Sequence, residues 1–373
     1  MRSSDEFEDR RLSRQELLKI AAFAGGAGLL AGRVPAAGAA LERLAAESGR
    51  LLVLDWVGYE VPQLYGPYLK KYPGQKPKFK FMTSETNALA QMSAGLKPDV
   101  VRPYVGYVRD FAESGFVQPW DTKLIPNLRY LNRNMVKAGQ HEGKQYGIPQ
   151  DWGFDAPLYR TDKVKVNPSR VSWGLLLDER YAGRISWWDD LYTLVWAGYY
   201  LGFKNPYDMN ASQLKQVRNL LISKVKKNVV RLFWSSETDM QNAFAAGDIW
   251  IAYAWPADWV AMRAKGLKVA YVHPKEGAIS WIGMLMLGND SPRPEHAHAY
   301  VDAWSSKQSG TWLLNNYGYG HSNTLARPKS RDLARVLQIA NPNALKEPNT
   351  HIDRYIPNRR EYAKNWREVK AAA

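Results

Sequence analysis

Aromatic rings stand at the ends of several short apolar runs in this sequence, where a buried strand would give way to a turn. The residues placed in this way are Trp56, Tyr59, Tyr104, Trp255, Trp281 and Tyr319. The face of an aromatic ring attracts a desolvated cation by about 0.5–2 kcal/mol, and it offers a flat wall to a methylene chain. One such ring is more often part of a core, but the set indicates a pocket for a small organic cation.

Carboxylates would have to accompany those rings, because a buried ammonium group without a paired charge costs several kcal/mol. Asp190 follows the strand-like run Gly183–Trp187 and is the first candidate for the counter-charge. Other acids could also turn toward a ligand, although each is more often a helix cap or a surface residue. They are Asp55, Glu85, Asp151, Asp155 and Asp258.

The elements that would position these groups begin with a buried strand at 51–54 and a helix at Gln63–Tyr72. The segment Lys78–Met82 alternates as a strand does, and Ser84 is a suitable N-cap for the helix that follows. A short strand at 99–104 completes a β-α-β-α-β pattern, which predicts a mostly parallel sheet. In open α/β sheets, ligands bind beyond the carboxyl ends of the strands.

A second α/β pattern follows the segment Gly147–Gly153, which fits neither strand nor helix periodicity. Strands are expected at Gly183–Trp187, Ile249–Ala254, Leu267–His273 and Trp281–Leu287, and helices at Leu214–Lys226, Asp239–Ala246 and Pro294–Trp304. The stretch 331–373 should be helical and pack on the second half. Two such halves joined by crossings predict a cleft, with hinges near Ile148–Trp152 and Val272–Lys275.

Several of these segments resemble, in order and spacing, the motifs of the spermidine/putrescine-binding proteins, the solute receptors of polyamine ABC importers. They are Leu54-Asp-Trp-Val-Gly-Tyr59, Pro98-Asp-Val-Val-Arg-Pro103, Tyr146–Gly153, Gly247–Trp255, Pro274–Trp281 and Gly318-Tyr319. The resemblance covers residues 50–330 and implies an α/β protein with the two-lobed type II periplasmic-binding fold. Lobe 1 would comprise 50–147 and 276–330, lobe 2 would comprise 148–275 and 331–373, and the ligand cleft would lie between them.

On this resemblance the chain would be a receptor and not an enzyme, binding a polyamine or a related small organic cation without a metal or cofactor. The expected ligand-binding residues are Trp56, Tyr59, Tyr104, Asp190, Trp255, Trp281 and Tyr319. Hinge closure would trap the ligand, and the closed monomer would dock on the membrane permease of an importer. Residues 1–40 resemble an export segment, with Arg10-Arg11 and Arg14 before an apolar run, and would direct the chain to the periplasm or cell surface.

The sequence departs from this family at the acids that surround the amines. Gly58, Thr193 and Gly283 stand where the family carries acids, so that Asp190 alone is retained. We therefore expect a diamine or a methylated amine to fit better than a tetra-amine. A carbohydrate receptor of the same fold is the alternative, because sugars also stack on tryptophan.

Composition argues against several other functions. The chain has 373 residues, enough for two domains, and its lack of cysteine excludes disulfides and thiolate chemistry. The net charge of +15 could indicate nucleic-acid binding, but the basic residues are dispersed and the export segment argues against it. No motif pairs two acids, or a nucleophile with a base, as a hydrolase would need.

Overall fold

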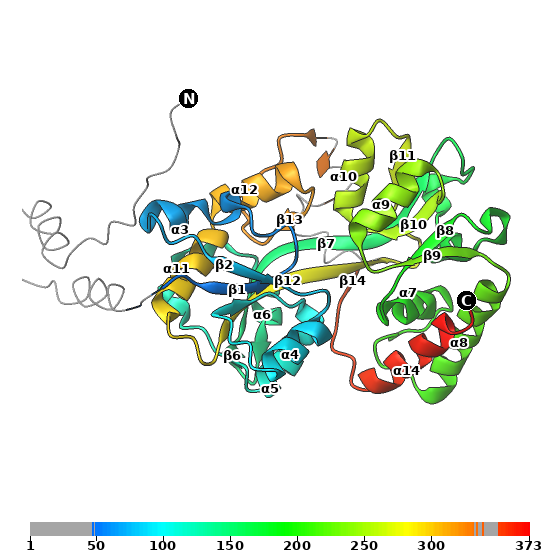
Figure 1. Ribbon diagram of the computed structural model, residues 1–373. Coiled ribbons are helices and arrows are strands. Elements are labelled where there is room, and N and C mark those ends of the chain that lie inside the picture. The colour runs from blue at the N-terminus through cyan, green and yellow to red at the C-terminus, as the bar shows by residue number, and fades with distance from the viewer. Residues whose placement is uncertain (1–46, 48, 332, 335–337, 339–349) are drawn as a thin grey trace, which may run out of the picture. The chain divides into compact units, whose positions relative to one another are not determined.

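The computed structural model describes residues 47, 49–331, 333–334, 338 and 350–373 (Figure 1). The expected export segment, 1–40, lies outside the described residues, as does most of 331–349. None of the helices within the described ranges is long and apolar enough to cross a membrane.

Twelve of the described strands form one sheet, with the order β2-β1-β3-β12-β7-β10-β8-β9 along its main path. The strands β2, β1 and β3 run parallel at one end, and β10, β8 and β9 run parallel at the other. The expectation of parallel strands is therefore confirmed within each group. The two central strands, β7 (Gly147–Arg160) and β12 (Ala278–Gly288), are antiparallel to each other; β7 is also antiparallel to β10, and β12 to β3.

We call the part around β1, β2 and β3 lobe 1. Its strands are β1 (Leu52–Asp55), β2 (Lys78–Phe81), β3 (Val100–Val101), β4 (Val117–Gln118), β5 (Gln140–His141), β6 (Lys144–Gln145) and β13 (Gly320–His321). Its helices are α3 (Gly66–Lys71), α4 (Glu85–Ser93), α5 (Val108–Glu113), α6 (Arg133–Ala138), α11 (Pro294–Trp304) and α12 (Lys307–Asn316).

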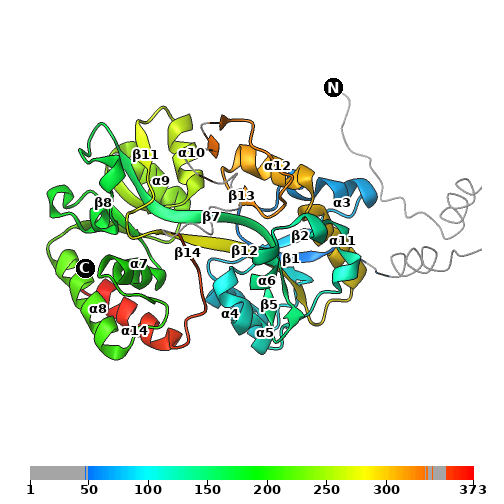
Figure 2. The same ribbon diagram turned by 180° about the vertical axis from the view of Figure 1, so that it is seen from behind.

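We call the part around β8, β9 and β10 lobe 2. Its strands are β8 (Ile185–Trp188), β9 (Val230–Trp234), β10 (Ile251–Ala254) and β11 (Val269–Tyr271). Its helices are α7 (Tyr192–Tyr200), α8 (Ala211–Lys226), α9 (Glu237–Ala246), α10 (Pro256–Ala264) and α14 (Arg359–Lys370). Figure 2 shows α14 lying against α8, and the two helices contact each other.

Local signals in the sequence account for many element ends. The Ser84 hydroxyl accepts a hydrogen bond from the Asn87 N–H at 3.0 Å and caps α4 as expected. Gly247 ends α9 with a φ of 85°, a conformation that favours glycine. The helix expected at Pro294–Trp304 is confirmed with the same bounds.

The lobes are joined by long strands rather than by loops. Residues 148–152, expected to act as a hinge, lie inside β7, and this strand pairs with β12 over most of its first half. Both strands run from lobe 1 to lobe 2 (Figures 1 and 2). A third connection follows β14 (Thr350–Ile352), which pairs with β12 and leads to α14. The residues 350–352 are therefore a strand, although this part of the chain was expected to be helical.

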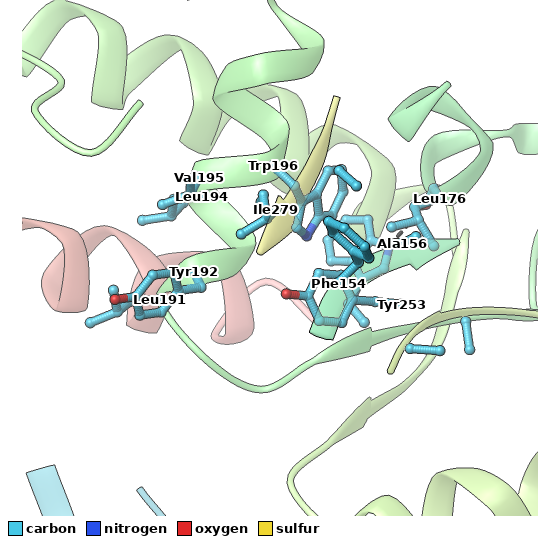
Figure 3. Packing of buried hydrophobic residues seen from close by; sticks show 14 of the residues in the cluster. Phe154, Ala156, Leu176, Leu191, Tyr192, Leu194, Val195, Trp196, Tyr253 and Ile279 are labelled. Carbon is cyan, nitrogen blue, oxygen red and sulfur yellow. Dashed lines mark hydrogen bonds between the residues drawn. The ribbon is translucent and has the colours of Figure 1, made fainter. Parts of the chain in front are cut away.

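Aromatic and aliphatic side chains fill the core of lobe 2 and continue along the crossing strands (Figure 3). The α7 helix is buried on nearly all sides because it lies between the sheet and other helices. Side chains drawn in Figure 3 come from several elements: Leu194, Val195 and Trp196 from α7, Phe154 and Ala156 from β7, Tyr253 from β10 and Ile279 from β12. This packing fixes the ends of β7, β10 and β12, from which the candidate site is built.

Candidate functional site

A narrow cavity lies near the ends of β3 and β10 and is enclosed by residues of both lobes and of the crossing strands. Its lining is aromatic or acidic throughout: Glu85, Tyr104, Tyr107, Asp155, Trp188, Tyr192, Trp255, Trp281 and Asp353. Its walls lie close together, so that the free space between them is very small. We call this space the acidic cavity.

Neighbouring rings form a connected wall around the acidic cavity. Trp56 stacks on Tyr104 with ring centroids 5.3 Å apart, and Tyr104 lies 5.3 Å from Trp281. On the lobe 2 side, Trp188 lies edge-on to Trp255 at 5.5 Å. Such offset and edge-to-face contacts stabilise the rings against one another and hold their faces in fixed directions.

Three carboxylates reach the acidic cavity from separate elements. Glu85 is the first residue of α4, and its Oε1 accepts a hydrogen bond from the Tyr104 N–H at 3.2 Å. Asp155 lies on β7 and is 3% exposed; no hydrogen bond of normal geometry reaches its Oδ1 from the described residues, although the Tyr253 and Trp255 side chains lie close enough to lower its pKa. Asp353 follows β14, and its Oδ1 accepts from the Tyr207 hydroxyl at 2.9 Å.

Burial makes these carboxyls reluctant to ionise. It raises the pKa of Glu85 to about 7 and that of Asp155 to about 7. The pKa of Asp353 is raised well above its usual range by burial and by the nearby charges of Asp155 and Glu85. Like charges close together in a dry site oppose ionisation of one another, and a cation placed among them would relieve that opposition.

Asp190 lies beside this cluster rather than among its lining residues. It is partly buried, and its Oδ1 accepts a hydrogen bond from the Tyr192 N–H at 3.0 Å at the start of α7. Burial raises its pKa to about 6, and its charge raises the pKa of Glu85. Its negative charge therefore acts on a cavity-lining carboxyl although Asp190 does not line the cavity itself.

The rings expected to bind ligand are distributed over two cavities. Tyr104, Trp255 and Trp281 line the acidic cavity, whereas Tyr59 and Tyr319 line a wider neighbouring cavity of about 790 Å³ that is open to solvent. The Trp281 and Tyr319 rings lie edge-to-face at 4.8 Å and connect the two walls. Trp56 lines neither cavity; it supports Tyr104 from behind, with its Nε1 donating to the Arg102 carbonyl at 3.2 Å.

One acid, Glu237, lines the wider cavity, and its neighbour Asp258 is not among the lining residues. Glu237 lies beside Asp258, whose Oδ2 accepts from the Trp255 N–H at 2.8 Å and whose Oδ1 accepts from the Gln241 side chain at 2.9 Å. Burial and the neighbouring Asp258 raise the pKa of Glu237 well above its usual range. Asp258 is thus a helix cap at the start of α10, with its oxygens already paired.

Two more of the candidate acids, Asp55 and Asp151, are held by a buried arginine. Arg102 is fully buried, and its guanidinium lies 2.8 Å from Asp55 and 2.9 Å from Asp151. The faces of Tyr59 and Trp304 cover the guanidinium at 4.6 and 4.1 Å. The negative charges of Asp55 and Asp151 are therefore compensated by Arg102 and are not available to a ligand in the acidic cavity.

The same arrangement explains the glycine at position 283. A side chain there would meet the Asp151 carboxylate, since a Cβ would lie 2.2 Å from its Oδ1. Asp151 also accepts a hydrogen bond from the Tyr59 hydroxyl at 2.5 Å. The chain thus places an acid from β7 in the space beside Gly283 and neutralises it with Arg102.

Several lining residues were not anticipated from the sequence, among them Tyr107, Trp188, Tyr192 and Asp353. Trp188 ends β8 just before Asp190, so its position after a strand was a usable signal. Asp353 follows a three-residue strand in a stretch expected to be helical, and nothing local marks it. Only the pairing of β14 with β12 brings it to the cavity.

Comparison with known proteins identifies the family. The sequence profile of the bacterial extracellular solute-binding proteins matches residues 77–334, and the chain belongs to this family. The resemblance and the two-lobed fold that it implied are therefore confirmed.

The relatives include receptors named for amines. The chain is 26% identical over 322 residues to the putrescine-binding periplasmic protein of Escherichia coli, covering 81% of this chain and 85% of that one. It is 24% identical over 314 residues to the putrescine/cadaverine-binding protein of Pseudomonas aeruginosa, covering 78% and 85%. Its fold matches the spermidine/putrescine ABC transporter substrate-binding protein of Streptococcus pneumoniae with a TM-score of 0.69 at 15% identity, covering 87% and 99%.

Proposed function

We propose that the chain captures a small organic amine in the acidic cavity and delivers it to the permease of an ABC importer. One observation carries this proposal: Asp155 is buried in an aromatic cavity beside Glu85 and Asp353, and no basic residue is among the described residues that line the cavity. An ammonium group would donate hydrogen bonds to these carboxylates and supply the missing positive charge. Trp255, Trp281 and Tyr104 would cover its methylene groups.

The relatives support the amine and the place of action. The two curated proteins described above are named for putrescine and cadaverine, and one of them is named as periplasmic. We propose accordingly that this chain acts outside the cytoplasm, and that residues 1–40 direct its export. A permease partner is supported by the ABC transporter named with the Streptococcus pneumoniae protein.

Capture would occur by closure of the lobes on the ligand. Glu85 and Tyr104 belong to lobe 1, Trp188 and Trp255 to lobe 2, so that a bound cation contacts both. We retain 50–147 with 276–330, and 148–275 with 331–373, as the proposed lobes; the limits at 147/148 and 275/276 fall near the starts of β7 and β12. Bending would then take place where these strands leave one lobe for the other.

A neutral sugar is the competing ligand, and the lining chemistry favours the amine over it. Sugar hydroxyls both donate and accept hydrogen bonds, and they are held by a mixture of Asn, Gln, Asp and Arg side chains. Of these types the described lining of the acidic cavity has only aspartates, Asp155 and Asp353, and it has no Asn, Gln or Arg. At pH 8, above the raised pKa values of Glu85 and Asp155, these carboxyls are ionised, and a neutral ligand would leave their charge uncompensated.

Isothermal titration of the chain purified without residues 1–40, at pH 8, tests the proposal. The ligands are putrescine, cadaverine, spermidine, choline and glucose, with calcium chloride as an inorganic cation. We expect saturable heat with at least one amine and none with glucose. Heat with glucose and with no amine would reject the amine site.

A further inference from the structure

Arg359 carries a positive charge from the C-terminal helix to the edge of the acidic cavity. It is the first residue of α14, which packs on α8 of lobe 2. Its guanidinium lies 3.7 Å above the ring of Tyr107, a lobe 1 residue that lines the cavity. Its Nη2 donates to the Gly106 carbonyl at 3.3 Å and to the Asp110 carboxylate at 3.2 Å.

This arginine is only partly neutralised by its contacts. Its Nε and Nη1 are buried and have no hydrogen-bond partner among the described residues. The Asp110 side chain, with which it pairs, is 25% exposed and therefore partly screened by water. The charge of Arg359 reaches the cavity, because it lowers the pKa of both Glu85 and Asp190 against the raising effect of burial.

Among the described residues, negatively charged groups around the acidic cavity outnumber the positively charged ones. Glu85, Asp155, Asp190 and Asp353 are the acids, and they act on one another through space. Lys370, which also acts on Asp190, is bound to Asp189 at 2.7 Å. Arg359 is thus a cation positioned to offset part of this negative charge before any ligand arrives.

We infer that Arg359 determines charge selectivity: its resident positive charge leaves room for an amine of low charge and disfavours a tri- or tetra-amine. This inference rests on the proposed amine site. Each additional ammonium group on a ligand would be repelled by the guanidinium in a region where water screens poorly. Removal of the Arg359 charge should therefore favour binding of the more highly charged amine.

The experiment compares putrescine with spermidine by titration on the native chain and on Arg359→Met, at pH 8 and 0.15 M salt. We expect the ratio of spermidine affinity to putrescine affinity to rise at least fivefold in Arg359→Met. Arg359→Lys keeps the charge and should keep the native ratio. Arg360→Met removes the same charge from the exposed neighbouring residue and should also leave the ratio unchanged.

The alternative is that Arg359 acts only as a structural contact between α14 and lobe 1. In that case Arg359→Met would weaken both amines by the same factor, and the inference would be wrong. Arg359→Gln, which keeps a donor for Gly106, serves as a second variant and should shift the ratio in the same direction. Binding of neither amine by the native chain would instead reject the proposed function, and this inference with it.

Discussion

Replacement of Asp155 by asparagine separates a ligand-binding role from a structural one, because the two roles predict opposite changes in stability. The side chain is 3% exposed, and burial raises its pKa from the usual 3.8 to about 7. A raised pKa means that the folded state binds the proton more tightly than the unfolded state. Stability without ligand therefore falls as the pH rises from about 4 to about 7, and the whole penalty is present above pH 7.

The size of that penalty follows from the shift. About 3 pKa units correspond to about 4 kcal/mol at 1.36 kcal/mol per unit. Asparagine has the same shape and cannot ionise, so Asp155→Asn should be more stable than the native chain at pH 8 by about 2–4 kcal/mol. At pH 4 the two proteins should differ little. The same change should weaken amine binding roughly 10–100-fold, since a hydrogen bond to a charged group contributes about 1.5–3 kcal/mol.

The assay combines urea unfolding at pH 4 and pH 8 with titration of putrescine. Asp208→Asn is the matched control, because Asp208 is an exposed aspartate in a turn of lobe 2. Asp208→Asn should change neither the stability in urea nor the putrescine affinity appreciably. A fall in stability at pH 8 with unchanged amine affinity would refute the reasoning, since it would make Asp155 a structural residue.

The remaining predictions concern the walls and charges of the site. Trp255→Ala should weaken putrescine binding at least tenfold by titration, because it removes a ring from the cavity wall, whereas an unchanged affinity would place the ligand elsewhere. Putrescine affinity should rise between pH 5.5 and pH 8, because the cation binds the ionised carboxylates. The rise should be up to about tenfold per pH unit for each proton released on binding. An affinity that does not change with pH would contradict the raised pKa values. Arg102→Met should lower the free energy of unfolding, measured in urea at pH 8, by about 3–5 kcal/mol, because the buried carboxylates of Asp55 and Asp151 lose their partner. A loss below about 1 kcal/mol would show that water reaches these carboxylates.

Local patterns in the sequence were sufficient for most elements. Alternation and capping predicted β2 and α4, and the bounds of α11 were correct, because these features depend on residues that are neighbours along the chain. The ring at the end of β10 was likewise found from its position after an apolar run. Periodicity failed at 147–153, since β7 is buried on both faces and shows no alternation.

The sequence by itself determined the fold class, the family and the aromatic character of the site. The charge of the site was decided by tertiary structure alone. Of the acids that the sequence offered, Asp55 and Asp151 are paired with Arg102 and Asp258 caps a helix, while Glu85 and Asp155 meet Asp353 across three elements. Whether a carboxylate is free for a ligand depends on which groups from distant segments lie within a few ångströms of it, and no local pattern contains that information.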